Sequence, residues 1–333
     1  MPEYPTKDFF GFAKSYVDAL EAVNIGSIDQ IHASSQSCFH KRLGMRNVVI
    51  IEAPHAVGNR ADVELAERAR GARDQVGHTY KILVRQSDQM VVLAPNVGWQ
   101  NLPLLRMLLV ECGLDLPVVV ENEAALAALA ETRRGAALNL DSVLCVWGEV
   151  GIGGGTVSGG QLMQGASGFA GEIGHLPINL DGERCGCGAI GCLETELGEE
   201  SLLRRAGRPP NGGRAALTEL FADAAAGKPS VIDALAEQGR WLGIGLAGVI
   251  NLLDPDVVVL GGFLGEALPF MVDTMKAELD TRSIAAIRRD LSVVAGACGS
   301  HAPLRGAAEM AWERVISNPL ESLERRMFVS ELA

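Results

Sequence analysis

The sequence predicts an α/β fold built on a mainly parallel sheet. Short apolar runs rich in Val, Leu and Ile alternate with longer segments of helical periodicity, which is the pattern of strand–helix repeats. The apolar runs are also continuous, as expected for strands buried on both faces. The composition agrees, because 48% of the 333 residues are hydrophobic and 21% are charged, as in a globular protein. A chain of this length is expected to form two domains or lobes.

The apolar runs define five expected strands: Arg46–Ala53, Gln89–Ala94, Pro117–Asn122, Ser142–Gly148 and Asp256–Gly262. Helical periodicity predicts helices at Asp8–Ala22, Ala61–Arg73, Leu102–Glu111, Ala124–Arg133 and Ile232–Leu253, with a short helix near Pro303–Trp312. The long helix contains WLGIGLAGVINLL, whose small residues at close spacing predict tight helix packing. The first ninety or so residues are less regular than the rest of the chain.

Charge and hydropathy exclude several classes of partner. The formal net charge is −12, and no stripe of Lys and Arg offsets it, so we expect no direct binding of nucleic acid. Nothing in this balance favours anionic membranes. No apolar run reaches the roughly 18 residues of a transmembrane helix, and MPEYPTKDFF does not resemble a signal peptide. We therefore expect a cytoplasmic protein.

The densest cluster of reactive side chains lies in GEIGHLPINLDGERCGCGAIGCLETELG. Its spacing is His175-x9-Cys185-x-Cys187-x4-Cys192. Three thiolates and one imidazole complete a tetrahedral shell for zinc and leave no open position, so the metal would be structural. Two other interpretations are a glycine-rich loop with free thiols and a redox pair, although Cys-x-Cys lacks the spacing of thioredoxin-like sites.

Two carboxylates flank the predicted ligands. Glu172 precedes His175 by three residues, and Glu194 follows Cys192 by two. A metal that anchors both ends of the loop would hold these side chains rigidly, and paired carboxylates are good acceptors for the hydroxyls of a polyol. The alternative is that both are solvated surface charges, as most glutamates are.

These residues resemble a known family. GEIGH followed by CGCGAIGCLE is similar to the signature of the ROK family, which groups bacterial sugar kinases with sugar-responsive transcriptional repressors. The resemblance extends to APNVGWQNLPL, VENEAALAALAE, the glycine-rich run beginning GEVGIGGG, and DPDVVVLGG, and it covers about Gln89 to Trp312. By themselves the glycine runs are weak evidence, because neither has the form of a P-loop or a Rossmann turn.

The resemblance implies a two-lobed actin-like ATPase fold with RNase H-like sheets and a zinc-binding loop. We expect a divergent or incomplete N-terminal lobe at residues 1–118, a larger sugar- and zinc-binding lobe at 119–302, and a C-terminal helix at 303–333 that packs on the first lobe. It implies zinc ligands His175, Cys185, Cys187 and Cys192, and sugar contacts from Gly98, Asn122, Glu123, Glu172, His175 and Glu194. Nucleotide would face Gly151, Gly153, Gly154, Gly261 and Gly262. The resemblance also implies a homodimer or homotetramer.

The sequence departs from the kinase branch in two ways. No Asp-x-Gly-Gly phosphate loop occurs in the first 150 residues. Glu123 also stands where the kinases have an aspartate as general base, and a misplacement of roughly 1 Å can cost about 100-fold in rate. The repressor branch fits better, yet no clear helix-turn-helix precedes the matched region. Either the first lobe has diverged, or the chain is an altered or truncated form of a longer regulator.

Three functional hypotheses follow. The first is a sugar-binding regulator of the repressor type with structural zinc. The second is a sugar kinase that uses ATP and Mg²⁺, with Glu123 as its base. The third is a decayed paralogue that holds zinc but no ligand. The first two differ in their dependence on nucleotide, because only a kinase must bind MgATP and turn it over.

Overall fold

The computed structural model of the chain describes residues 48–52, 83–94, 99–103, 105–106, 118–149, 151–288 and 291–317. All five predicted strands lie in this part of the chain, as β1 (Val48–Glu52), β3 (Met90–Ala94), β5 (Val118–Asn122), β6 (Ser142–Gly148) and β9 (Val257–Gly262). The helices predicted at Asp8–Ala22 and Ala61–Arg73 lie outside the described residues. None of the helices that the structure describes has the length and apolarity to cross a bilayer.

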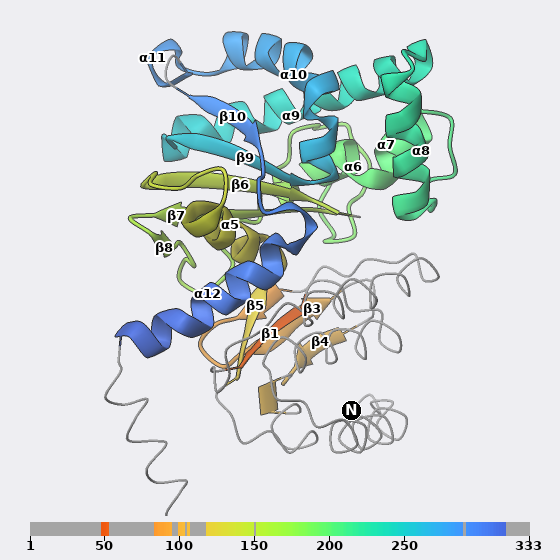
Figure 1. Cartoon of the computed structure of the whole chain (residues 1–333). Coiled ribbons are helices and arrows are strands. Elements are labelled where there is room, and N and C mark those ends of the chain that lie inside the picture. The colour runs from red at the N-terminus through yellow and green to blue at the C-terminus, as the bar shows by residue number, and fades with distance from the viewer. Residues whose placement is uncertain are drawn as a thin grey trace, which may run out of the picture.

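A five-stranded sheet forms the centre of the larger part of the molecule (Figure 1). Its order is β10-β9-β6-β7-β8, completed by β7 (Ile152–Ser158), β8 (Gln161–Leu162) and β10 (Ser292–Ala295). Strands β10, β9 and β6 are parallel, whereas β6, β7 and β8 are antiparallel. The expectation of a mainly parallel sheet was therefore wrong. Only a short turn joins β6 to β7, and a parallel crossover needs a dozen or more residues.

Helices cover both faces of this sheet. Leu144 and Val146 of β6 point toward α9 (Pro229–Leu253) and α10 (Phe263–Arg282) in one buried cluster. The alternate residues, Cys145 and Trp147, point to the other face, where they pack with the alanines of α5 (Glu123–Arg134). Alternate side chains of one strand thus fill two cores, which explains why the predicted strands are apolar throughout.

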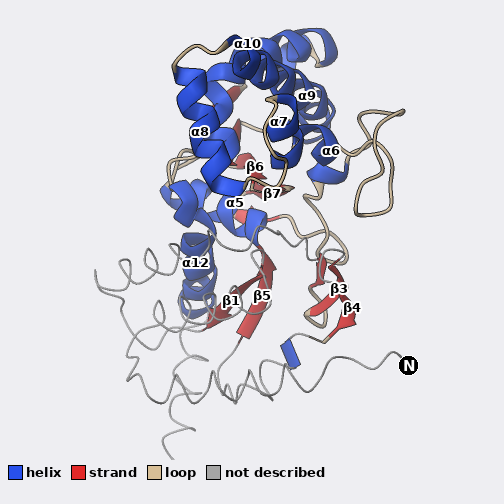
Figure 2. Cartoon of the chain, turned by 90° about the vertical axis from the view of Figure 1, so that its right-hand side faces the viewer, coloured by secondary structure: helices blue, strands red, loops and turns tan. Residues whose placement is uncertain are grey.

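The remaining strands form two smaller sheets beneath this body (Figures 1 and 2). Strands β1 and β5 pair antiparallel, and β2 (Leu83–Arg85), β3 and β4 (Trp99–Leu102) form an antiparallel meander. The helix predicted at Leu102–Glu111 is not described beyond residue 106, and β4 already occupies its first residue. Strand β5 leads directly into α5, so this connection joins the two parts of the molecule.

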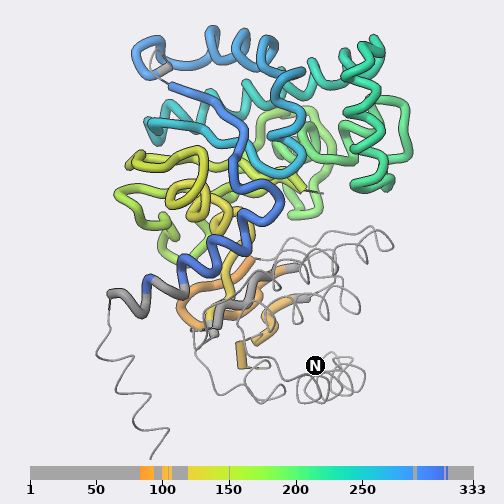
Figure 3. Tube along the Cα trace, in the orientation of Figure 1, coloured from red at the N-terminus to blue at the C-terminus, as the bar shows by residue number. Residues whose placement is uncertain are grey.

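The last described helix, α12 (Ala302–Ser317), packs along α5, although it is far from α5 in sequence (Figure 3). It also packs against β1 (Figure 1). Gly306 allows the close approach, because a Cβ there would lie 1.8 Å from the Leu126 carbonyl oxygen. Arg134 of α5 donates from Nε to Glu309 Oε1 of α12 at 2.5 Å. The helices that the sequence analysis did not predict are η3 (Ile173–His175), α6 (Leu193–Leu197), α7 (Glu199–Arg205), α8 (Gly213–Ala225), α10, α11 (Ala285–Arg288) and η4 (Gly299–His301).

Candidate metal centre and ligand cleft

The loop between η3 and α6 is folded onto itself by backbone hydrogen bonds. Ile178 N donates to Gly191 O at 2.8 Å, and Cys185 N donates to Ala189 O at 2.8 Å. Gly191 has φ +70°, and a Cβ there would lie 1.6 Å from the Asn179 carbonyl oxygen, so only glycine fits. This tight fold returns the cysteines toward His175.

The four predicted zinc ligands meet at one point. One donor atom from each of His175, Cys185, Cys187 and Cys192 lies within 4.8 Å of all the others. Cys187 Sγ is 3.6 Å from Cys192 Sγ, and Cys185 Sγ is 3.7 Å from His175 Nδ1. A tetrahedral zinc with bonds of about 2.0–2.3 Å separates its ligand atoms by roughly 3.3–3.8 Å. The donor set and these separations therefore fit a closed zinc site.

Glu172 faces the other nitrogen of the histidine ring. Its Oε2 atom is 3.8 Å from His175 Nε2, while Nδ1 faces the sulfur of Cys185. This order of carboxylate, imidazole and metal position matches the arrangement that orients histidine ligands and raises their basicity. Glu172 is therefore placed to orient the His175 ring as a metal ligand.

The thiol of Cys192 would resist ionisation in the absence of a metal. Burial, followed by contacts with Cys187 and Cys185, raises the pKa of Cys192 to about 12. Zinc binds the thiolate and must displace this proton. Metal affinity should therefore fall as the pH is lowered.

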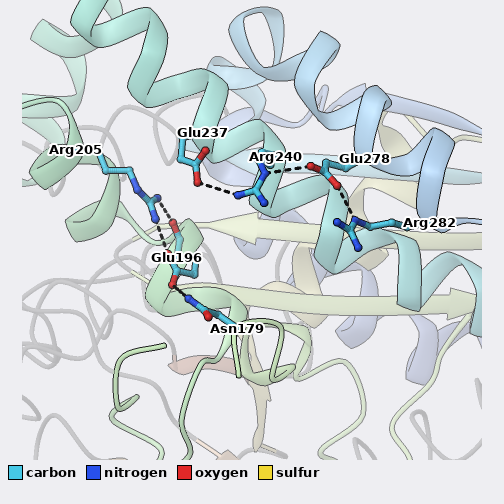
Figure 4. Close-up of polar contacts among 7 residues, drawn as sticks. All are labelled: Asn179, Glu196, Arg205, Glu237, Arg240, Glu278 and Arg282. Carbon is cyan, nitrogen blue, oxygen red and sulfur yellow. Dashed lines mark hydrogen bonds and ion pairs between the residues drawn. The ribbon is translucent and has the colours of Figure 1, made fainter. Parts of the chain in front are cut away.

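Ion pairs hold the base of the loop against the helical body (Figure 4). Asn179 Nδ2 donates to Glu196 Oε1 at 2.7 Å, and Arg205 binds the other carboxylate oxygen at 2.5 Å. A second chain of contacts, through Arg240 and Glu278, links α9 to α10 (Figure 4). The loop between η3 and α6, called the metal loop below, is therefore held to α6 and α7 by contacts that do not involve a metal.

A cleft of about 650 Å³, including its opening to solvent, lies next to the metal cluster. Leu83 and Leu93 line it from the β2–β3 hairpin, and His175 and Cys187 line it from the metal loop. The other lining residues are Asn122, Glu123, Ala124, Trp147, Glu149, Gly151, Ile152, Gly153 and Glu172. The metal centre therefore forms part of the cleft wall.

Asn122 and Glu123 enter the cleft where β5 becomes α5. Asn122 is the N-cap of α5, and its Oδ1 accepts from Ala124 N at 2.8 Å and from Ala125 N at 3.4 Å. Because Oδ1 is occupied by the cap, the Nδ2 group is the part of this side chain suited to a ligand, and it would donate to a hydroxyl oxygen. Glu123 is the first helical residue, where the helix dipole favours its negative charge.

Several predicted ligand residues do not line the cleft. Glu194 Oε2 accepts from Ile152 N at 3.0 Å, and its Oε1 lies 3.7 Å from Cys185 Sγ, so this carboxylate ties the metal loop to β7. Gly154, Gly261 and Gly262 are also absent from the lining. Gly98 lies outside the described residues.

Packing accounts for the two glycine runs. A Cβ at Gly155 would lie 2.8 Å from the Ala124 carbonyl oxygen, so the glycines of β7 let α5 lie directly on the sheet. A Cβ at Gly261 would lie 2.2 Å from the Trp147 ring, and one at Gly262 would lie 1.8 Å from Gly148 O. Gly151 and Gly153 do reach the cleft. Close approach within the protein is therefore sufficient to require glycine at Gly155, Gly261 and Gly262.

The sequence analysis did not predict the polar-edged Trp147 and the charged Glu149 as cleft residues, nor the apolar lining residues Leu83, Leu93, Ala124 and Ile152. Trp147 is 3% exposed, and its ring covers Gly261. Glu149 follows the end of β6, where the chain turns toward β7. A charged residue at the end of a buried strand is a signal that could have identified Glu149, since ligands bind at strand ends in α/β folds.

Replacing Glu172 by alanine should weaken zinc binding about 10- to 100-fold, because the histidine ligand would lose the carboxylate that faces its second nitrogen. Zinc transfer to a chromogenic chelator measures this change. Glu183→Ala is the matched control, because Glu183 lies in the same loop but pairs with Arg204 at 3.3 Å. Equal zinc retention in the two variants would contradict the role of Glu172.

Comparison with known proteins gives a consistent picture. The family model described as "ROK family" matches residues 61–314. The glucokinase of Streptomyces coelicolor is 32% identical over 273 residues, which cover 75% of this chain and 85% of the glucokinase. The xylose repressor of Bacillus subtilis is 30% identical over 223 residues, which cover 67% of this chain and 57% of the repressor.

The fold is also found among solved structures. A ROK family glucokinase from Streptomyces griseus, solved in complex with glucose and AMPPNP, aligns with a TM-score of 0.63 and 29% identity. The alignment covers 78% of this chain and 90% of that chain. The similarity therefore spans most of the chain, and the relatives include both catalytic and regulatory proteins.

Proposed function

The chain belongs to the ROK family, and on this premise we propose that it is a sugar-binding regulator of the repressor type with structural zinc, and not an efficient kinase. It has the actin-like ATPase fold of that family. The proposal concerns the cleft beside the metal centre, with Asn122, Glu123, Glu172 and His175 as the groups that meet the sugar.

The charge of the cleft is the observation that carries this proposal. Three carboxylates line it, from Glu123, Glu149 and Glu172, and no Lys or Arg is among its described lining residues. A neutral sugar presents hydroxyl groups that donate to carboxylates. The phosphates of ATP would instead meet like charges, whereas phosphoryl transfer depends on cations and amide groups placed around them.

The position of Trp147 supports the same view. Its indole ring lies over Gly261, one of the two glycines expected to face adenosine. Gly262 is the N-cap of α10, and its φ of +60° places it against the Gly148 carbonyl. Packing against β6 therefore accounts for the absence of a side chain at both positions, so these glycines do not by themselves indicate a nucleotide site.

A second candidate function is an ATP-dependent kinase for a hexose or an N-acetylhexosamine. The similarity to the glucokinases favours it, since these relatives are matched over a larger share of their length than the xylose repressor. Glu123 would then be the general base, and Mg²⁺ would have to screen the carboxylates from the phosphates.

A thermal-shift panel of D-glucose, D-xylose and N-acetyl-D-glucosamine, each with and without MgATP, separates the two functions. A sugar at a hundred times its Kd should stabilise the fold by about 2.7 kcal/mol, which corresponds to a Tm increase of roughly 5–10 °C for a domain of 150–250 residues. We expect one sugar to act without any further effect of MgATP.

A response to MgATP together with formation of sugar phosphate would reverse the assignment. In that case Glu123→Gln should abolish transfer, because the base is lost, while the exposed Glu200→Gln on α7 should leave it unchanged. A protein that binds zinc but responds to none of the sugars would contradict both functions and favour the decayed paralogue.

A further inference from the structure

A chain of side-chain amides surrounds Glu121, which immediately precedes the cleft residue Asn122. Glu121 is 3% exposed and lies on β5. Its Oε2 atom accepts from Gln86 Nε2 at 2.9 Å and from Gln164 Nε2 at 3.0 Å. Its Oε1 atom accepts from Asn122 N at 2.7 Å. Two segments distant in sequence, around Gln86 and Gln164, therefore converge on one buried carboxylate of β5.

The amide chain continues from Gln86 to the backbone of β5. Gln89 Nε2 donates to Gln86 Oε1 at 2.7 Å, and Gln89 Oε1 accepts from Val120 N at 2.5 Å. Gln89 lies in the turn between β2 and β3 with φ +54°, and its side chain reaches from this turn to the backbone of β5. This side chain thus takes the place of a ladder hydrogen bond between β5 and the β2–β3 hairpin.

The direction of this chain is fixed from one end to the other. Val120 N–H can only donate, so Gln89 must present its oxygen to it and its nitrogen to Gln86. Gln86 must then present its nitrogen to residue 121, where Asn122 N–H also donates. The last position needs a group that only accepts, and an ionised carboxylate is that group. Glutamine at position 121 would set two N–H donors against each other.

Keeping a carboxylate buried here is costly. Burial raises the pKa of Glu121, although the hydrogen bonds from Asn122 N and Gln164 oppose this effect. If this position served packing alone, uncharged side chains could fill it without the cost of burying a carboxylate. A carboxylate provides acceptors for all three N–H groups at this point, so it fixes the positions of the groups that donate to it.

The same network joins β5 to the hairpin that lines one side of the cleft. Gln164 belongs to the segment after β8, and this segment approaches the hairpin again where Gln86 N donates to Ser167 O at 3.2 Å. Gly168 permits the contact, because a Cβ there would lie 2.4 Å from Gln86 Cγ. The hairpin that supplies Leu83 and Leu93 to the cleft is therefore tied to the residue that precedes Asn122.

We propose that Glu121 is a positioning residue of the ligand cleft: as the terminal acceptor of the amide chain, it holds Asn122 and Glu123 in register with the β2–β3 hairpin. The effect on sugar binding rests on the proposed function of the cleft. The hydrogen-bonded register does not depend on the proposed function, and it can be measured without any ligand.

A double-mutant cycle tests this role. Glu121→Gln and Gln86→Glu should each weaken binding of D-glucose, D-xylose or N-acetyl-D-glucosamine, whichever the wild type binds, by at least about tenfold. In the double variant the carboxylate stands at position 86 and the amide at position 121, so the carboxylate has moved one place along the chain of hydrogen bonds. The amide introduced at position 121 then donates to the carboxylate introduced at position 86 and to Gln164, whose exposed side chain can turn to accept. We expect the double variant to recover most of the affinity, which a merely structural defect would not do.

Hydrogen exchange of the ligand-free protein gives the independent readout. Peptides covering residues 83–94 and 118–134 should exchange faster in each single variant and return toward wild-type rates in the double variant. Gln89→Asn is a milder probe if Glu121→Gln does not fold, since asparagine tolerates positive φ but is one methylene too short for the relay. Glu200→Gln serves as the control.

Unchanged exchange and unchanged sugar affinity in both single variants would overturn the positioning role. The positioning role would also be overturned if the double variant lost sugar affinity by the sum of the two single losses. In that case the direction of the hydrogen bonds between positions 86 and 121 would not matter. If the wild type binds none of the three sugars of the thermal-shift panel, the proposed function fails on that result, and the exchange data alone decide the role of Glu121.

Discussion

Replacing Cys187 by serine is expected to release the metal and to destabilise the protein by the largest amount of any single change in the cleft. The structural zinc of small domains contributes about 10–16 kcal/mol of apparent binding energy, and a closed four-ligand site depends on every ligand. Even a loss of about 5 kcal/mol would lower the Tm by roughly 10–20 °C for a domain of 150–250 residues. Zinc analysis should fall from about one ion per chain toward zero.

Cys298→Ser is the matched control for this experiment. Cys298 is buried, at 4% exposure, but it lies before η4 and is not a member of the four-residue cluster. Its substitution should leave the zinc content unchanged, whatever its effect on stability. Full zinc occupancy and an unchanged Tm in Cys187→Ser would exclude the metal site.

Glu131→Gln is expected to produce the second large effect, a loss of about 2–5 kcal/mol in the free energy of unfolding. Glu131 is fully buried in α5, and its carboxylate accepts from Ala136 N at 2.8 Å, Ala297 N at 3.0 Å and Cys298 N at 2.8 Å. A glutamine would turn one of these acceptors into a donor and leave a buried backbone N–H unsatisfied. Denaturant unfolding monitored by tryptophan fluorescence measures the loss.

The backbone at two glycines lies so close to the Glu131 carboxylate that the surrounding structure cannot shift. A Cβ at Gly135 would lie 2.0 Å from Glu131 Oε2, and one at Gly296 would lie 2.6 Å from Oε1. Because the backbone surrounds the carboxylate this closely, it cannot relax around an amide. The exposed Glu200→Gln should stay within about 0.5 kcal/mol of the wild type. A similarly small change in Glu131→Gln would show that the three hydrogen bonds contribute little.

The consequence of Glu131 for function lies in the orientation of α5. The helix carries Asn122 and Glu123 into the cleft at its N-terminal end, while Glu131 fixes the other end to the segment after β10. Its small residues lie on the glycines of β7, so its distance from the sheet is set by backbone contact. Contacts at both ends of α5 thus determine the positions of Asn122 and Glu123 in the cleft.

The metal ligands could be predicted because their information is local. Thiols and imidazole are the side chains that zinc prefers, and His175, Cys185, Cys187 and Cys192 lie within eighteen residues of one another. The buried strands and α5 could be predicted for a similar reason, since hydrophobic periodicity reflects the environment of consecutive residues. Sequence by itself therefore determined the cluster of four donor side chains and most of the central strands.

Tertiary structure alone decided which atoms face the cleft. Glycine suits a phosphate and a packed helix equally well, so only the positions of α5 and Trp147 showed what Gly155 and Gly261 contact. The orientation of Glu194 toward β7, the entry of Glu149 into the cleft, and the convergence of Gln86 and Gln164 on Glu121 all join segments distant in sequence. Such contacts depend on strand register and helix placement, which no local pattern of residues encodes.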